Sequence, residues 1–138
     1  MLFRSGQLVL ASTLPQEYEK VTSELADSPN DVLAIEKSVF GADHCSVGYE
    51  VAKHWGFPLS ISLPILHHHE PLGYSGDDSK INFANRAIYL SDILVSIFYS
   101  DEPEEYYTQF QREAKQLLGL KSKCIESIIE DAHTEIDS

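Results

Sequence analysis

The sequence predicts an all-α protein, a helical bundle of about six to seven helices. Apolar residues recur at spacings of three and four along nearly the whole chain of 138 residues, which is the period of one helix face. Glycine and proline are few, seven and six, and several stand where one periodic segment ends and the next begins. No repeat or long linker divides the chain, so we expect a single domain over residues 1–138.

The composition indicates a globular protein, with 43% hydrophobic and 23% charged residues. The net charge of −12 and the scattered basic residues disfavour binding to nucleic-acid phosphates and to anionic lipids. We therefore expect no nucleic-acid or membrane partner. Cys45 and Cys124 form no CxxC pair and are expected to be reduced thiols. No apolar run reaches the length of a signal segment or a membrane span, so we predict a cytoplasmic protein.

The first elements are short helices separated by capping signals. Residues 8–11 predict a short helix or a turn, because a strand there would have no partner. Thr13 and Pro15 then mark the start of a helix. Residues 28–31 cap the next helix, which ends at Gly41. The inner face of the helix after Pro15 is predicted to be Tyr18, Val21 and Leu25.

The centre of the chain is the stretch from residue 43 to 71, which holds five of the six histidines. Asp43 caps a helix that is broken before Pro58. Pro64 lies within the following helix and predicts a kink there, or a helix that begins near Leu63. The predicted inner face of the helix after Asp43 is His44, Val47, Gly48, Val51, Ala52 and Trp55.

The second half begins with a loop over residues 72–80. Residues 81–100 are apolar on almost every side and predict a central, buried helix. A further helix runs from near Pro103 to Gly119, and a last one starts near Ser122. The residues expected to face inward are Tyr106, Phe110, Ala114 and Leu117 in the first of these, and Ile125, Ile128, Ile129, Ala132 and Ile136 in the second.

Four residues are candidate metal ligands: His44, His68, His69 and Asp92. They come from three predicted helices, and their nitrogen and oxygen atoms suit iron, manganese, zinc or nickel. Buried histidines more often find hydrogen-bond partners, and Asp92 is a suitable partner. We therefore expect no cofactor, with a divalent metal as the open alternative. Cys45 beside His44 is rejected as a Cys–His nucleophile, because adjacent helical residues point about 100° apart.

An ordered set of motifs resembles the HDOD domain, the HD-related output domain of bacterial signalling proteins. The set consists of EKSVFGADH at residues 36–44, then Gly48, then WGFP at residues 55–58 and HHEP at residues 68–71. Asp92 stands where that family places an aspartate on a late helix. The resemblance implies an HD-domain-like helical fold.

The resemblance covers about residues 2–98, and residues 101–138 fit only as further helices. The wider HD superfamily of metal-dependent phosphohydrolases carries a His-Asp metal pair where this sequence has Phe3 and Arg4. Phenylalanine cannot bind a metal, and arginine is a fixed cation. The resemblance therefore implies a metal site that has lost its central pair, and we expect no catalytic residues.

The resemblance leaves two functions open. The first is a non-catalytic signal-transduction or regulatory module that acts through protein partners. The second is an HD-type metal-dependent phosphohydrolase or cyclic-dinucleotide phosphodiesterase. The sequence also starts without the helices that usually precede this part of the family, so the domain is expected to be N-terminally shortened. The apolar surface that those helices would cover either faces a second copy or is closed by the C-terminal helices, and on this ground we predict a homo-oligomer.

Overall fold

The computed structural model describes residues 5–28 and 31–137, and this part of the chain forms eight helices and no strand. The all-α class is therefore confirmed. The helix count is one above the expected range, because the segment predicted as a helix or a turn forms a complete helix. The helices are α1 (Ser5–Thr13), α2 (Pro15–Asp27), α3 (Val32–Phe40), α4 (His44–His54), α5 (Leu59–His67), α6 (Ser79–Tyr99), α7 (Pro103–Leu118) and α8 (Ser122–Asp137).

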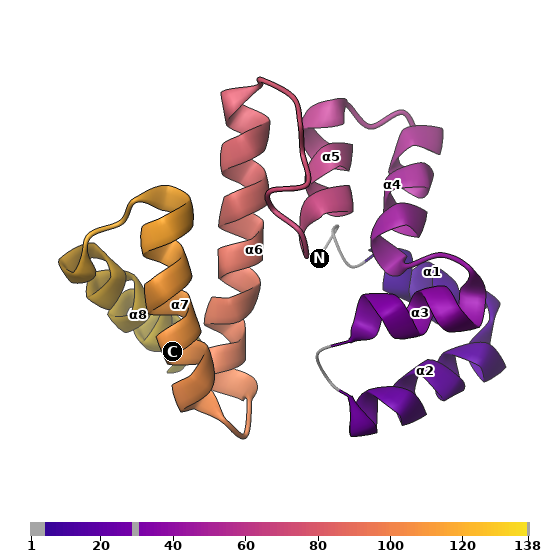
Figure 1. Ribbon diagram of the computed structural model, residues 1–138, viewed down its shortest axis with the longest axis horizontal. Helices are drawn as coiled ribbons and strands as arrows, with labels where there is room; N and C mark the ends of the chain where they lie inside the picture. Colours follow the sequence, from indigo (N-terminus) through magenta and orange to yellow (C-terminus); the bar gives the residue numbers. More distant parts are fainter. Residues whose placement is uncertain (1–4, 29–30, 138) are drawn as a thin grey trace.

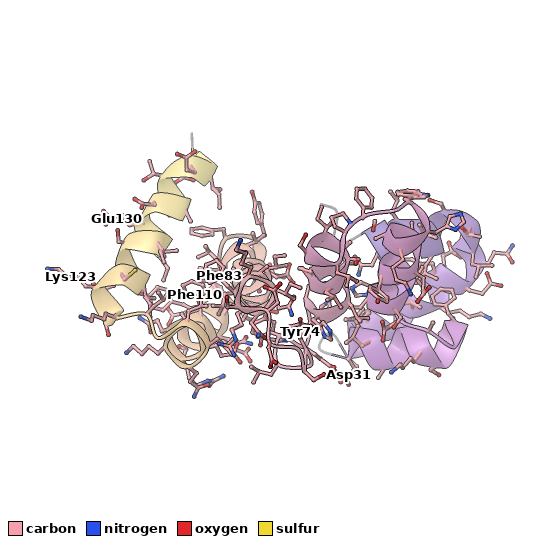
Figure 2. The ribbon with its side chains drawn as sticks, turned by 90° about the horizontal axis from the view of Figure 1, so that it is seen from above. Asp31, Tyr74, Phe83, Phe110, Lys123 and Glu130 are labelled. Atoms are coloured by element: carbon pink, nitrogen blue, oxygen red, sulfur yellow. The ribbon has the colours of Figure 1, made fainter. Side chains whose placement is uncertain are left out.

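The long helix α6 stands between two groups of helices, α1–α5 on one side and α7–α8 on the other (Figure 1). It packs against α5 in the first group and against α7 in the second. Phe110 lies at the centre of the second group, while Lys123 and Glu130 mark α8 at its outer edge (Figure 2). The buried core between α6 and this group consists of Leu90, Ile93, Phe110, Ala114 and Ile125. No helix in the described ranges has both the length and the apolar character needed to cross a bilayer.

The expectation of a central, buried helix over residues 81–100 is confirmed for the position of α6, which packs between α5 and α7, but its burial is incomplete. Four of its residues are buried, Ile81, Asn85, Leu90 and Ile93, and most of the others are half-buried, because α5 and α7 cover the helix from two sides. Ile136 on α8 is also exposed, contrary to expectation, because that helix is packed mainly through its first half. The exposed apolar residues of α6 are Phe83, Val95 and Tyr99.

The helix α5 begins at Leu59, directly after Pro58, and contains Pro64. The alternative of a helix that begins near Leu63 is therefore wrong. Proline lacks the N–H that would reach the carbonyl four residues earlier. That carbonyl belongs to Ser60, an exposed residue of the first turn, where water can replace the lost bond. The helix therefore accommodates Pro64.

Trp55 was predicted to face the core, but its side chain is 66% exposed. It follows the last residue of α4, and Gly56 after it adopts φ 79°, a left-handed conformation that favours glycine. The chain turns here towards α5, and the Trp55 ring lies outside that turn beside Phe57, with ring centroids 6.4 Å apart. Helical periodicity places Trp55 on the inner face of α4, but none of the described helices covers the C-terminal end of that face.

Two glycines allow α1, α4 and α5 to approach closely. A Cβ atom on Gly6 would lie 1.8 Å from the carbonyl oxygen of His44. A Cβ atom on Gly48 would lie 2.9 Å from a methyl group of Ile65. At Gly6 the neighbouring atoms belong to the backbone of α4, so only glycine permits this approach. The approach buries the first turn of α4, which carries His44.

Candidate functional site

A cluster of three histidines and one cysteine lies where the start of α4 meets the end of α5. His44 and Cys45 are the first two residues of α4, whose N-terminus is capped by Asp43 through the N–H of Ser46 at 2.9 Å. His68 caps the C-terminus of α5, and His69 follows it. One nitrogen or sulfur atom from each of the four residues lies within 4.8 Å of all the others. We call these four residues the His/Cys cluster.

Glu36 on α3 fixes the orientation of the His44 ring. One carboxylate oxygen, Oε1, lies 2.5 Å from Nδ1 of His44 and also accepts the backbone N–H of His44 at 3.2 Å. Both residues are fully buried. The Nδ1 proton of His44 therefore belongs to the bond with Glu36, and Nε2 presents its lone pair on the opposite side of the ring.

His68 is held in the same way by a backbone carbonyl. Its Nδ1 lies 2.6 Å from the carbonyl oxygen of Ile65, which can only accept, so this nitrogen carries the proton. Nε2 of His68 lies 3.1 Å from Nε2 of His44. Two neutral rings with these tautomers would direct two lone pairs at each other. The contact therefore needs a shared proton or a metal ion between the rings.

The surroundings favour a neutral His68. Burial lowers the pKa of this residue to about 4, and the neighbouring His69 and His44 act in the same direction. The hydrogen bond to Ile65 and the charge of Asp92 oppose the decrease. His68 is therefore uncharged at neutral pH in the metal-free protein.

Cys45 extends the cluster with a sulfur atom. Its Sγ lies 3.7 Å from Nδ1 and 3.9 Å from Nε2 of His68. Burial, followed by the charges of Asp43, Glu36 and Glu70, raises the pKa of the Cys45 thiol to about 12, and the backbone N–H of His69 opposes the increase. Without a metal the side chain is a buried, protonated thiol, which makes it a poor nucleophile.

The structure unites three of the four predicted ligands. His44, His68 and His69 belong to the His/Cys cluster, whereas Asp92 on α6 is not one of its four members. The charge of Asp92 nevertheless raises the pKa of His68, so this carboxylate lies within electrostatic reach. The predicted replacement of the metal pair by Phe3 and Arg4 falls outside the described residues.

Sequence reasoning missed Glu36 and Cys45. Glu36 lies four residues after Val32 on α3, which is the spacing of one helix face, and a carboxylate on an inward face indicates a buried partner. Cys45 gives no such signal, because its contact with His68 spans 23 residues of sequence. That contact depends on how α4 and α5 pair.

A groove with a volume of about 470 Å³ opens next to the cluster, and Cys45 and His69 form part of its wall. Among the described residues along it, the fixed charges are two carboxylates, Asp43 and Glu70, and one cation, Lys37. The ammonium group of Lys37 lies 3.9 Å from the carboxylate of Asp43. The groove therefore offers a phosphate group little positive charge.

The helical fold and the buried histidines define an HD-related helical domain. The chain belongs to the HDOD domain family, because the family model matches residues 1–71, about half of its length. This family supports a role as an HD-related signalling module. No curated protein and no solved structure gives a significant match to the chain.

Proposed function

We propose that this HDOD domain is a non-catalytic regulatory module that binds a protein partner through the turn between α4 and α5. The observation that carries the proposal is an exposed apolar surface at that turn. Its members are Trp55, Phe57 and Leu59, with exposed fractions of 66%, 36% and 57%. We call these three residues the Trp55 surface.

The Trp55 surface has the composition of a binding hot spot. An exposed tryptophan supplies a large apolar area with little side-chain entropy to lose, and such residues are enriched at interface centres. The two aromatic rings lie next to each other, so they form one patch. Exposed apolar side chains that gather in this way are typical of interaction sites.

The charge of the chain indicates the chemistry of the partner. A net charge of −12 over 138 residues steers partners with a basic surface and repels acidic ones. The partner that fits is a protein with an apolar pocket for Trp55 and a basic rim.

The cluster supports a structural role better than phosphohydrolysis. A metal-dependent hydrolase needs a metal with an open position and cations that hold the phosphate oxygens. His44 and His68 are buried, and among the described residues that line the neighbouring groove the one fixed cation is Lys37, paired with Asp43. We therefore expect no turnover of model phosphodiesters or cyclic dinucleotides, with or without added manganese or iron.

Cross-linking in the native cell tests partner binding directly. The protein is expressed as the wild type, as Trp55→Ser and as Phe83→Ser, and the cross-linked proteins are quantified by mass spectrometry. Phe83 is a matched control, since it is 60% exposed on α6. We expect one protein to be captured by the wild type and by Phe83→Ser, and lost with Trp55→Ser. Equal capture by all three would contradict the proposal.

The predicted homo-oligomer is the second occupant that fits the Trp55 surface. Sedimentation at micromolar concentration distinguishes the two cases. Self-association that is lost in Trp55→Ser would assign the surface to a second copy of the chain. A monomeric wild type that still captures a different protein through Trp55 assigns it to that protein.

A further inference from the structure

We propose that His44, Cys45, His68 and His69 bind one zinc ion through three imidazole nitrogens and a thiolate. This inference does not depend on the Trp55 surface. The resemblance to HD proteins implied a different set of ligands, with Asp92 in place of Cys45. The sulfur ligand comes from the structure alone.

The spacing of the donor atoms fits a single ion. Zinc–nitrogen bonds of about 2.0–2.1 Å and a zinc–sulfur bond of about 2.3 Å, at tetrahedral angles, separate two nitrogens by about 3.3 Å and a nitrogen from a sulfur by about 3.6 Å. The Nε2 atoms of His44 and His68 are 3.1 Å apart, and Sγ of Cys45 is 3.9 Å from Nε2 of His68. Together with His69, all four residues offer an atom within 4.8 Å of the others.

The hydrogen bonds behind the cluster present the correct nitrogen atoms. Metal-binding histidines usually donate the N–H of the other ring nitrogen to a carboxylate or a carbonyl, which fixes the tautomer. Nδ1 of His44 is bonded to the Glu36 carboxylate, and Nδ1 of His68 to the carbonyl of Ile65. Both histidines therefore direct Nε2 towards the same point from two different helices.

A shared proton is the alternative occupant of that point. It would lie between the Nε2 atoms of His44 and His68, which are 3.1 Å apart. This arrangement involves neither Cys45 nor His69. A metal ion uses all four residues, and its binding would displace the proton of the Cys45 thiol. A bond from the sulfur atom of Cys45 to a metal ion therefore distinguishes metal binding from a shared proton.

The donor set also selects the metal. Three nitrogens and a thiolate favour zinc and disfavour magnesium, calcium and manganese, which prefer oxygen. Four protein ligands complete a tetrahedral shell, as in structural zinc sites, and leave no position for a substrate. The ion would join the start of α4 to the end of α5, while the Trp55 surface lies at the opposite ends of both helices.

Cobalt substitution tests the site in the full chain. The protein is freed of metal with a chelator and titrated with Co²⁺, and the thiolate-to-cobalt charge-transfer band and the tetrahedral d–d bands are recorded. We expect both to saturate at one equivalent and to be displaced by Zn²⁺. Zn²⁺ should also raise the melting temperature of the metal-free protein, because it binds the folded state.

Variants identify the ligands. Cys45→Ser should lose the charge-transfer band and bind Zn²⁺ at least about tenfold more weakly, and His69→Gln should also bind at least about tenfold more weakly. His69 is half-buried, so this second variant tests the site even if Cys45→Ser fails to fold. Cys124→Ser and His133→Gln change exposed residues and should behave as the wild type.

Three results would overturn the proposal. They are the lack of stoichiometric binding by the wild type, binding without a charge-transfer band, and retention of that band in Cys45→Ser. Trp55→Ser should bind the metal normally. Failure of the metal site is therefore distinguishable from failure of the proposed partner surface.

Discussion

Glu36 binds His44 at two points, because one carboxylate oxygen contacts the ring nitrogen Nδ1 and accepts the backbone N–H of the same residue. The two residues belong to different helices, α3 and α4, and both are fully buried. The pair joins these helices and sets the direction in which Nε2 of His44 points. Glu36 therefore helps to orient the His/Cys cluster, although it is not one of the four members.

Glu36→Ala should destabilise the metal-free protein by about 3 kcal/mol. The change leaves two buried N–H groups of His44 without an acceptor and creates a cavity. Glu36→Gln retains an oxygen acceptor and should cost less. Urea denaturation measures the free energies of unfolding. Glu50→Ala, at an exposed position of α4, is the control and should change stability by less than about 0.5 kcal/mol. Equal effects at both positions would contradict the role of Glu36.

Gly6→Ala tests the crossing of α1 and α4. The added Cβ would lie 1.8 Å from the carbonyl oxygen of His44, so the two helices must separate. We expect a loss of about 3 kcal/mol, in the upper range for overpacked sites. Leu8→Ala is the control on α1, because Leu8 is 69% exposed. Thermal denaturation that gives Gly6→Ala the same melting temperature as the wild type would show that α1 does not pack as described.

The pKa of His68 predicts how the stability of the metal-free protein depends on pH. The folded-state pKa of about 4 lies below the usual value of 6.5, so the unfolded chain binds a proton in this interval and the folded protein does not. Stability should therefore be fully present above about pH 6.5 and fall as the pH decreases towards about 4, by about 3 kcal/mol for this residue.

Urea denaturation of chelator-treated protein at several pH values in this interval measures that slope. His68→Gln should have a flatter slope than the wild type, because the titrating group is removed. His133→Gln, at an exposed position, should retain the wild-type slope. Identical slopes in all three proteins would mean that His68 titrates equally in the folded and unfolded states.

The two cysteines should differ in reactivity. In the metal-free folded protein, Cys45 is 3% exposed and burial raises its pKa to about 12, whereas Cys124 is exposed. Since the thiolate is the reactive species, iodoacetamide should modify Cys124 at least about a hundredfold faster near pH 8. Peptide mapping by mass spectrometry measures both rates. The difference should disappear in urea, and equal rates in the folded protein would contradict the burial of Cys45.

Phe110→Ala tests whether residues 1–138 form one domain. Phe110 is 3% exposed in the core between α6, α7 and α8, so its truncation should cost about 3–5 kcal/mol. In a single cooperative domain, the fluorescence of Trp55 on the other side of α6 reports the same shifted transition as far-UV circular dichroism. Tyr99→Ala, at a site that is 73% exposed, is the control. A Trp55 transition that remains unchanged in Phe110→Ala would indicate two independent units.

Local signals in the sequence predicted several helix ends, although Thr13 belongs to α1 and Leu14 takes the N-cap position of α2. Gly41 and Gly119 end α3 and α7 in left-handed conformations, and Asp43 caps α4, all as the sequence indicates. Predictions of burial were less accurate, because helical periodicity shows which residues share a face but not how far the neighbouring helix extends. Trp55 and Ile136 share faces with buried residues, yet both extend beyond the elements that cover them.

The sequence predicted only part of the site, because spacing along the chain does not report tertiary packing. His44, His68 and His69 follow from motifs that are visible in the sequence, and the structure brings them together. The sulfur of Cys45 joins them because α4 and α5 pair with a register that sets Cys45 against His68. That register depends on tertiary packing, which sequence spacing does not report.

X-ray absorption at the zinc edge of the zinc-loaded full chain tests the central claim most directly. The number and type of ligands around the metal distinguish the His/Cys cluster from any other arrangement. We predict a shell of one sulfur at about 2.3 Å and three nitrogens at about 2.0–2.1 Å. A shell of nitrogen and oxygen atoms without sulfur would contradict the site proposed for His44, Cys45, His68 and His69.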